Sequence, residues 1–173
     1  MATNDTSAPK ANWVTRVIIG RDPKRTLVRI LVWVGLILLV YRFALLPIRV
    51  QGISMLPTYK ENGVNVVNRL AYLFRPPQRG DVVAIRYAGE HIMLCKRIVG
   101  LPGERVAFHD GRLLINGQPL NEPYLKLPCN WEHAEETVDP NEYYVVGDNR
   151  SMDYDLHYQG RPTRDRIVGK LVL

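Results

Sequence analysis

Three short clusters in this sequence carry side chains that can take part in catalysis. The first is the loop Gly-Ile-Ser-Met-Leu-Pro-Thr at residues 52–58, which follows the longest apolar run of the chain. Pro57 disfavours helical backbone at Leu56, so Ser54 is expected in turn or extended backbone rather than inside a helix. Such a serine is either a solvated turn residue or a nucleophile, and this loop alone does not distinguish the two.

The second cluster surrounds Lys96 in the apolar stretch 93–99, which the sequence predicts to be a strand. Strand alternation sends Lys96 to the face opposite Cys95 and Arg97. A strand lysine either points to solvent or is enclosed as a general base. Holding a lysine of ordinary pKa ~10.4 neutral at pH 7 costs about 4.6 kcal/mol. Burial in an apolar wall with no carboxylate beside it supplies such a shift, and this stretch contains no acid.

The third cluster is Gly-Asp-Asn-Arg at residues 147–150, after a predicted strand at 143–146. By itself it is also ordinary turn chemistry. Histidine is the usual partner of a nucleophilic serine, but the four histidines are in no recognisable triad context; they are His91, His109, His133 and His157. A Ser/Lys dyad is a known variant of the serine–base arrangement, and Ser54 with Lys96 would form one.

Length and charge limit the classes of protein to consider. A chain of 173 residues holds one domain of roughly 100–150 residues plus an anchor or tail. Much of the net charge of +6 lies in residues 1–29, before and at the start of the longest apolar run, so nucleic acid is not the expected partner. Cys95 and Cys129 have no metal-ligand spacing, and a disulfide between them stays open. We expect neither a metal nor another cofactor.

The apolar run at residues 27–46 predicts a membrane anchor. It is interrupted by Arg29, Tyr41 and Arg42, and its uninterrupted part spans only about 18 Å as a helix, short of a ~30 Å hydrocarbon core. The two arginines can snorkel to the headgroups, which extends the span. A buried core helix and a cleavable signal peptide are the alternatives, but no small-x-small cleavage site follows. Basic residues before the run predict a cytoplasmic N-terminus and an exported remainder.

After the anchor the pattern becomes that of short strands separated by turn signals. The sequence predicts an all-β barrel or sandwich, with a hairpin turning at Asp110-Gly111 and an irregular stretch at 121–140. The predicted strands are 48–51, 63–67, 82–87, 93–99, 105–108, 113–117, 143–146 and 167–173.

Together the three clusters resemble the signature motifs of type I signal peptidases. The motifs are Ser-Met-Leu-Pro-Thr from Ser54, Lys-Arg-Ile-Val-Gly-Leu-Pro-Gly-Glu from Lys96 and Gly-Asp-Asn-Arg from Gly147, in the family's order after an anchor. The resemblance covers roughly residues 50–170. It implies a mostly β fold, with a β-barrel or sandwich core and a small β insertion, preceded by one transmembrane helix.

The parts implied for this chain are four. Residues 1–26 would be a basic cytoplasmic segment and 27–46 the transmembrane anchor. Residues 47–105 with 142–173 would form the catalytic core, and 106–141 the insertion that contains the hairpin. The catalytic domain would then lie on the outer side of the inner (cytoplasmic) membrane, and the lipid bilayer would be a partner.

The resemblance also implies the reaction. Ser54 would be the nucleophile and Lys96 the general base of a serine endopeptidase that removes signal peptides from exported preproteins with small residues before the cut. An acyl-enzyme would form and be hydrolysed. Shallow apolar pockets lined by Ile53, Met55 and Val83 would select the small residues.

Supporting roles follow from the same resemblance. Asp148 and Arg150 would form a pair that shapes the site, and Asp155 matches an aspartate that lies later in the family's motif. Gly52 stands where the family often has a serine that helps to bind the oxyanion, so the backbone N–H of Ser54 would carry more of that task. Losing one such donor typically costs ~2.7–4 kcal/mol.

Asp153 is a further departure from the family pattern. It replaces a serine that normally hydrogen-bonds the catalytic lysine, and a carboxylate touching Lys96 would raise its pKa. We therefore expect either that Asp153 points away or that the local alignment with the family motif shifts. Two other functions remain open: a Ser/Lys peptidase devoted to one pilin or conjugation substrate (or a self-cleaving repressor), and a catalytically silent, membrane-anchored β module that binds exported chains.

Overall fold

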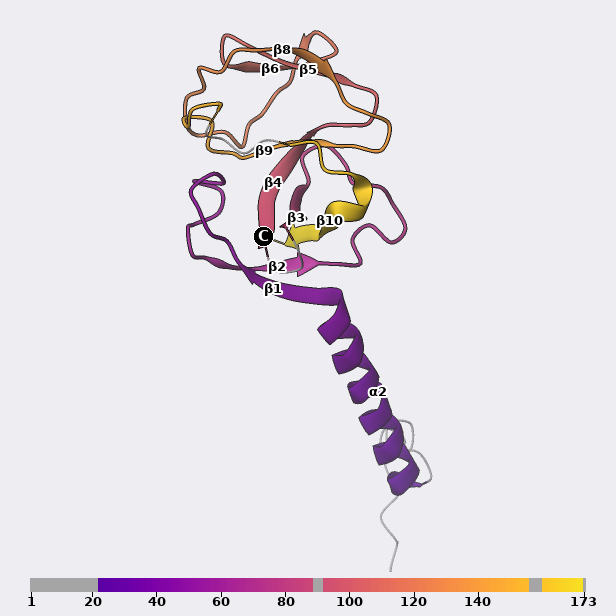
Figure 1. Cartoon of the computed structure of the whole chain (residues 1–173). Helices are drawn as coiled ribbons and strands as arrows, with labels where there is room; N and C mark the ends of the chain where they lie inside the picture. Colours follow the sequence, from indigo (N-terminus) through magenta and orange to yellow (C-terminus); the bar gives the residue numbers. More distant parts are fainter. Residues whose placement is uncertain (1–21, 89–91, 156–159, 173) are drawn as a thin grey trace, which may run out of the picture. The chain divides into compact units, whose positions relative to one another are not determined.

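The structure, a computed structural model, describes residues 22–88, 92–155 and 160–172. The chain divides into two compact units, Met1–Arg42 and Phe43–Leu173 (Figure 1). Most of the basic segment expected at 1–26 lies outside the described residues, as do His91 and His157.

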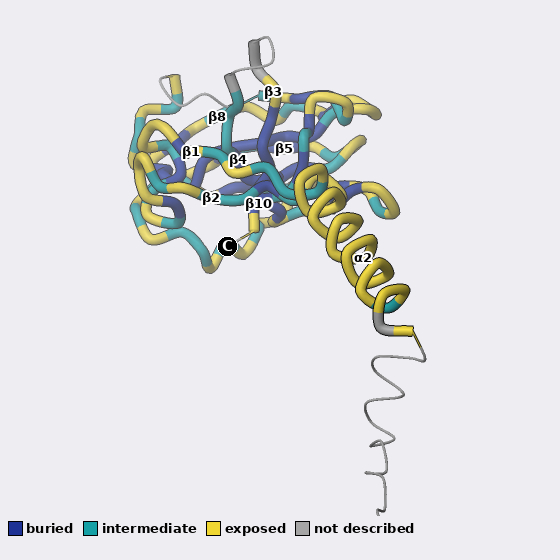
Figure 2. Tube along the Cα trace, turned by 90° about the horizontal axis from the view of Figure 1, so that it is seen from below, coloured by how far each residue is buried: buried dark blue, intermediate teal, exposed yellow. Residues whose placement is uncertain are grey.

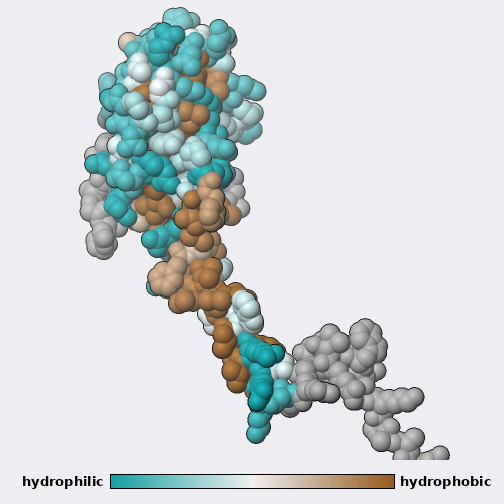
Figure 3. Space-filling model, turned by 90° about the vertical axis from the view of Figure 1, so that its right-hand side faces the viewer, coloured by the Kyte–Doolittle hydropathy of each residue, from teal (hydrophilic) through white to brown (hydrophobic). Residues whose placement is uncertain are grey.

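The first unit is described as one helix, α2 (Pro23–Ala44), which runs two residues into the second unit. Asp22 caps its start, because its side-chain oxygen accepts a hydrogen bond from the Lys24 N–H at 3.2 Å, and Pro23 suits the first helical position. Figures 2 and 3 show a helix that is exposed along nearly all its length and apolar over most of it. Its 22 residues span about 33 Å, so it is the one described helix long and apolar enough to cross a membrane.

The helix begins and ends earlier than the run predicted at 27–46. Leu45 and Leu46 belong instead to strand β1 (Leu45–Arg49), which also contains Pro47. Because β1 is an edge strand, the missing N–H of that proline can be tolerated. The predicted strand at 48–51 is therefore shifted toward the helix.

The second unit holds a six-stranded antiparallel sheet with the strand order β1-β2-β10-β3-β4-β9. Its remaining strands are β2 (Val64–Asn68), β3 (Val82–Ala88), β4 (Ile92–Gly100), β9 (Tyr144–Val146) and β10 (Ile167–Val172), the last preceded by the short 3-10 helix η1 (Arg164–Arg166). Both faces of the sheet are buried. Val82 and Ala84 of β3 enter one core cluster with Met55 and Tyr59, whereas Val83 and Ile85 enter the cluster on the opposite face, as strand alternation requires.

A second, four-stranded sheet is formed within residues 105–137 (Figure 1). It consists of β7 (Gln118–Pro119), β6 (Arg112–Ile115), β5 (Arg105–His109) and β8 (His133–Thr137), in that order. Phe108 and Trp131 of this region pack with Val99 and Tyr144 of the first sheet in one core cluster. The small sheet is thereby fixed to the larger one.

The β5–β6 hairpin turns at the predicted Asp110-Gly111. Both residues have positive φ (48° and 70°), which two-residue hairpin turns of this type require. A Cβ on Gly111 would lie 2.0 Å from the carbonyl oxygen of Cys129, so only glycine fits there.

The prediction of a mostly β fold after one apolar helix is confirmed. Strand β8, however, lies in the stretch expected to be irregular. It has the sequence His-Ala-Glu-Glu-Thr and is largely solvent-facing, so it lacks the apolar alternation that identifies strands from sequence.

Candidate active site

Ser54 lies in the predicted loop, half-buried at the top of a tight turn. The Leu56 N–H donates to the Ile53 carbonyl oxygen at 3.1 Å, and the Tyr59 N–H donates to the Met55 carbonyl oxygen at 2.9 Å. The Met55 side chain, 1% exposed, is buried in the core and anchors the turn. Gly52 has φ +87°, with open space where a Cβ would lie, so glycine is needed there for its backbone conformation rather than for room.

Lys96 is enclosed in strand β4, with 3% of its surface exposed. Burial lowers the pKa of Lys96 from its ordinary 10.5 to about 8, against a smaller opposing effect of Cys95. No carboxylate among the described residues forms an ion pair with it. It therefore lies in the kind of environment that a lysine base requires.

The turn that follows β9 connects these two parts of the site. The Asp148 carboxylate accepts hydrogen bonds from Arg97 Nε at 2.8 Å and from Arg97 Nη2 at 2.6 Å, and Arg97 directly follows Lys96. The same carboxylate accepts a hydrogen bond from Thr58 Oγ1 at 2.6 Å, at the end of the Ser54 loop. Asn149 bonds to the loop as well, with its backbone N–H 2.9 Å from the Ser54 carbonyl oxygen. The three sequence clusters thus meet in space.

The expected pair between the Asp148 and Arg150 side chains is not formed. Arg150 is fully buried and binds Glu122, with Nη2 2.6 Å from Oε1, while Asp148 binds Arg97. An arginine and a carboxylate joined by two parallel hydrogen bonds are a favoured pair in a buried site. Asp148 forms such a pair with Arg97, and Arg150 forms one with Glu122. Sequence reasoning missed Arg97, Glu122 and Thr58; only the position of Arg97 beside Lys96 gave any indication.

Ser54 borders a cavity of about 410 Å³ between strand β1, with the two residues that follow it, and the first half of β4. Its lining residues are Leu46, Pro47, Ile48, Arg49, Val50, Gln51, Ser54, Met93, Leu94 and Cys95. Met55 and Val83, expected to line substrate pockets, are instead 1% and 0% exposed in the core clusters and do not border it. Ile53 is half exposed beside Ser54 but is also not among the lining residues.

Lys96 borders a smaller cavity of about 80 Å³, and Leu94 lines both cavities. Within the described residues no hydrogen bond joins Ser54 Oγ to Lys96 Nζ. Catalytic hydrogen bonds are often long in the absence of substrate and tighten in the complex.

The remaining predicted residues lie at the surface. Asp153 is exposed and is not among the groups that shift the pKa of Lys96, in agreement with the expectation that it points away. Asp155 is also exposed.

Cys95 and Cys129 are both free thiols, and burial raises the pKa of Cys95 to about 12.

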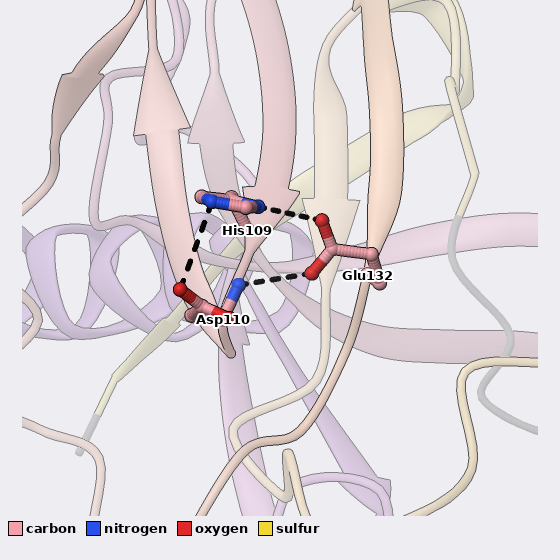
Figure 4. Close-up of side chains that lie close together, drawn as sticks. All are labelled: His109, Asp110 and Glu132. Atoms are coloured by element: carbon pink, nitrogen blue, oxygen red, sulfur yellow. Dashed lines mark hydrogen bonds and ion pairs between the residues drawn. The ribbon is translucent and has the colours of Figure 1, made fainter.

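One cluster in the described residues offers three potential metal ligands, His109, Asp110 and Glu132 (Figure 4). All three side chains are exposed, and His109 Nδ1 lies 2.6 Å from Glu132 Oε1, while Glu132 Oε2 accepts the Asp110 N–H at 2.9 Å. The hydrogen bond to Glu132 raises the pKa of His109, which favours the protonated ring that cannot bind a metal. These contacts clamp the β5–β6 turn to the residue before β8.

The chain is similar to known proteins of one family. The family model described as signal peptidase, peptidase S26, matches residues 24–173. A signal peptidase I of Leptolyngbya laminosa is 39% identical over 128 residues, which are 69% of this chain and 63% of that protein. Signal peptidase I V of Bacillus subtilis is 33% identical over 135 residues, 70% of this chain and 80% of the relative. The crystal structure of a signal peptidase I from Enterococcus faecalis has a TM-score of 0.47 and 30% identity, over 57% of this chain and 98% of that one.

The chain therefore belongs to the signal peptidase family, peptidase S26. It spans 63% and 56% of the length of two of its relatives, those of Leptolyngbya laminosa and Synechocystis. Family membership and the apolar helix α2 together indicate membrane anchoring.

Proposed function

We propose that this chain is a membrane-anchored serine endopeptidase that removes N-terminal signal peptides from exported preproteins. Membership of the signal peptidase family supports the reaction. The observation that carries the choice of catalytic groups is the enclosed Lys96, tied through Arg97, Asp148 and Asn149 to the loop that bears Ser54. A lysine acts as a base near neutral pH only where its environment favours the free amine.

Lys96 is the general base. With a pKa of about 8, about a tenth of it is neutral at pH 7, against about one part in three thousand for an ordinary lysine. The Asp148 carboxylate is held by Arg97 and does not stabilise the ammonium form of Lys96.

The reaction proceeds in two halves. The neutral Lys96 Nζ takes the proton of Ser54 Oγ as the oxygen attacks the scissile carbonyl carbon, and the Ser54 N–H faces the developing oxyanion. The tetrahedral intermediate collapses by breaking the C–N bond, and Lys96 returns the proton to the leaving amine of the mature protein. Water, deprotonated by Lys96, then attacks the ester carbonyl; the bond between the acyl carbon and Ser54 Oγ breaks, Lys96 returns the proton to Ser54 Oγ, and the signal peptide leaves as a carboxylate.

The cleft is suited to an extended peptide. Strand β1 is an edge of its sheet, and β4 pairs with β9 only from Arg97 onward, which leaves one backbone edge of its first half without a strand partner among the described residues. A substrate strand can add to such edges through main-chain hydrogen bonds. Val50, Met93 and Cys95 restrict the cavity beside Ser54, which favours small side chains next to the cut.

The proposed location is the inner membrane. Basic residues precede and enter α2, which by the positive-inside rule leaves the N-terminus in the cytoplasm and Phe43–Leu173 outside, where exported chains emerge. The bilayer and the preprotein are the partners.

The test uses the full chain in detergent with a model preprotein, and the cut is mapped by mass spectrometry. Ser54→Ala and Lys96→Met are each expected to reduce cleavage to background while the fold is retained. Lys126→Met, which removes an exposed lysine, is the matched control and is expected to cleave at the wild-type rate. Wild-type activity in either site variant would refute the dyad.

An acylating inhibitor separates the alternatives. Labelling at Ser54 together with cleavage between small residues supports a general signal peptidase. Labelling at Ser54 with no cleavage of several preproteins would indicate a peptidase devoted to one substrate. Neither labelling nor cleavage would indicate a silent binding module.

A further inference from the structure

Asn149 bonds to both backbone carbonyls next to the nucleophile. Its side-chain Nδ2 donates to the Ile53 carbonyl oxygen at 3.0 Å, and its backbone N–H donates to the Ser54 carbonyl oxygen at 2.9 Å. Asn149 is 5% exposed, and its Oδ1 accepts a hydrogen bond from Ser151 Oγ at 2.6 Å. Because a carbonyl oxygen can only accept, the amine end of the amide must face Ile53.

These bonds fix the peptide plane that contains the Ser54 N–H. The Ile53 carbonyl and the Ser54 N–H belong to one planar peptide unit, and the unit is trans, since Leu56–Pro57 is the one cis bond in the described residues. In a trans unit the two groups point in opposite directions. Holding the Ile53 oxygen on Asn149 therefore directs the Ser54 N–H away from Asn149. The Leu56 N–H also bonds to this oxygen, but that bond fixes the unit only within its own turn.

The Ser54 N–H itself is available to a ligand. In the part of the chain that the structure describes, it donates to no protein acceptor, whereas the carbonyls of Ile53 and Ser54 are both occupied. Gly52 brings no side chain that could serve as a second donor at this point. Hydrogen bonds accepted by the amide oxygen also polarise the unit and strengthen its N–H as a donor.

We propose that Asn149 is a positioning residue that aims the Ser54 N–H at the oxyanion of the acylation transition state. Its neighbour Asp148 is bound to Arg97 of β4, so the same turn sets the nucleophile's peptide plane relative to the strand that carries Lys96. This inference rests on the proposed function, because it assumes that Ser54 attacks a carbonyl. It predicts that Asn149 affects the transition state and leaves substrate binding unchanged.

The experiment compares Asn149→Ala and Asn149→Asp with wild type, and uses Asn130→Ala, at an exposed loop asparagine, as the control. Both Asn149 variants keep the backbone N–H and lose the Nδ2 donor. Removing an oxyanion donor outright typically lowers kcat about 10²–10³-fold. Changing the direction of the Ser54 N–H while keeping it is therefore expected to lower kcat about 10- to 100-fold. KM and the pKa that governs the pH–rate profile should stay unchanged, because Lys96 remains enclosed.

A peptide aldehyde with alanine at its reacting end gives the second readout. Its adduct with Ser54 places an oxygen in the oxyanion position, so its inhibition constant should rise by the same factor as kcat/KM falls. The corresponding peptide alcohol, which forms no adduct, should bind all variants equally. Parallel losses for the aldehyde and the alcohol, or a shifted pKa, would overturn the proposal in favour of a general structural role.

The failure of this inference can be distinguished from the failure of the proposed function. If Ser54→Ala still cleaves, the proposed function is wrong. If Ser54→Ala is inactive and the Asn149 variants keep kcat within threefold of wild type, only the positioning role is wrong. Should Asn149→Ala fail to fold, the isosteric Asn149→Asp decides the question.

Discussion

Cleavage by this chain should depend on pH through the protonation of Lys96. Burial lowers the pKa of Lys96 to about 8, so its neutral fraction is about one tenth at pH 7, one half at pH 8 and nine tenths at pH 9. At pH 7 this is about 300 times the neutral fraction of an ordinary lysine. We expect kcat/KM to rise about tenfold per pH unit below pH 7.5 and to level off above pH 8.5.

The same burial of Lys96 lowers the free energy of unfolding. The pKa of Lys96 is lower in the folded chain than in the unfolded chain. Between about pH 8 and 10.5 the unfolded chain therefore binds more protons than the folded chain, and stability rises with pH across this window. Below pH 8 the full penalty applies, about 3 kcal/mol for a pKa lowered from 10.5 to about 8. At pH 9 the penalty has fallen to about 2 kcal/mol.

Lys96→Met tests this coupling, because methionine keeps an unbranched apolar side chain and removes the charge. The variant should be inactive, yet more stable than wild type by up to about 3 kcal/mol at pH 7 and by about 1 kcal/mol less than that at pH 9. Urea unfolding of the full chain in detergent at the two pH values measures the difference. The control Lys126→Met should show no pH-dependent difference.

Two results would refute the reasoning. One is a pH–rate profile that keeps rising to about pH 10, which would mean that Lys96 titrates like a solvated lysine. The other is a stability difference between Lys96→Met and wild type that does not change between pH 7 and 9. Either result would show that Lys96 is not enclosed in solution.

Two further substitutions test the supporting structure. Arg150→Met should lower the free energy of unfolding by about 3–5 kcal/mol, because it leaves the buried Glu122 carboxylate without its positive partner and, among the described residues, with only the Tyr124 hydroxyl as donor. Arg150→Met combined with Glu122→Gln should recover part of the loss in urea unfolding. Gly52→Ala should cost about 1 kcal/mol in the same measurement from its positive φ alone, since a Cβ there meets open space; a loss above about 3 kcal/mol would contradict the geometry.

Much of the fold could be predicted because local patterns encode it. The Asp110-Gly111 hairpin is an example, since the turn requires positive φ at both residues and the flanking strands are apolar. The strand order could not be predicted, because β10 pairs with β2 and β3 across most of the chain. Strand β8 was missed because its polar residues face solvent on a small sheet.

Less of the candidate site than of the fold could be predicted from the sequence. Ser54 and Lys96 could be chosen by residue type and local context, but the partners of Asp148 could not, because the spacing between Asp148 and Arg97 carries no periodic signal. Met55 illustrates a further limit. An apolar residue beside a nucleophile can line a pocket or anchor the loop in the core, and only the packing distinguishes the two.

Burial lowers the pKa of Lys96 although charged residues, including its neighbour Arg97, are part of the same region of the fold. Two carboxylates stand near the site, and each is held by an arginine: Asp148 by Arg97 and Glu122 by Arg150. Arginine stays protonated in proteins, so the buried charge of each of these carboxylates stays compensated, and neither carboxylate is among the groups that shift the pKa of Lys96. The fold can thus keep two buried carboxylates in this region while burial remains the main influence on the pKa of Lys96.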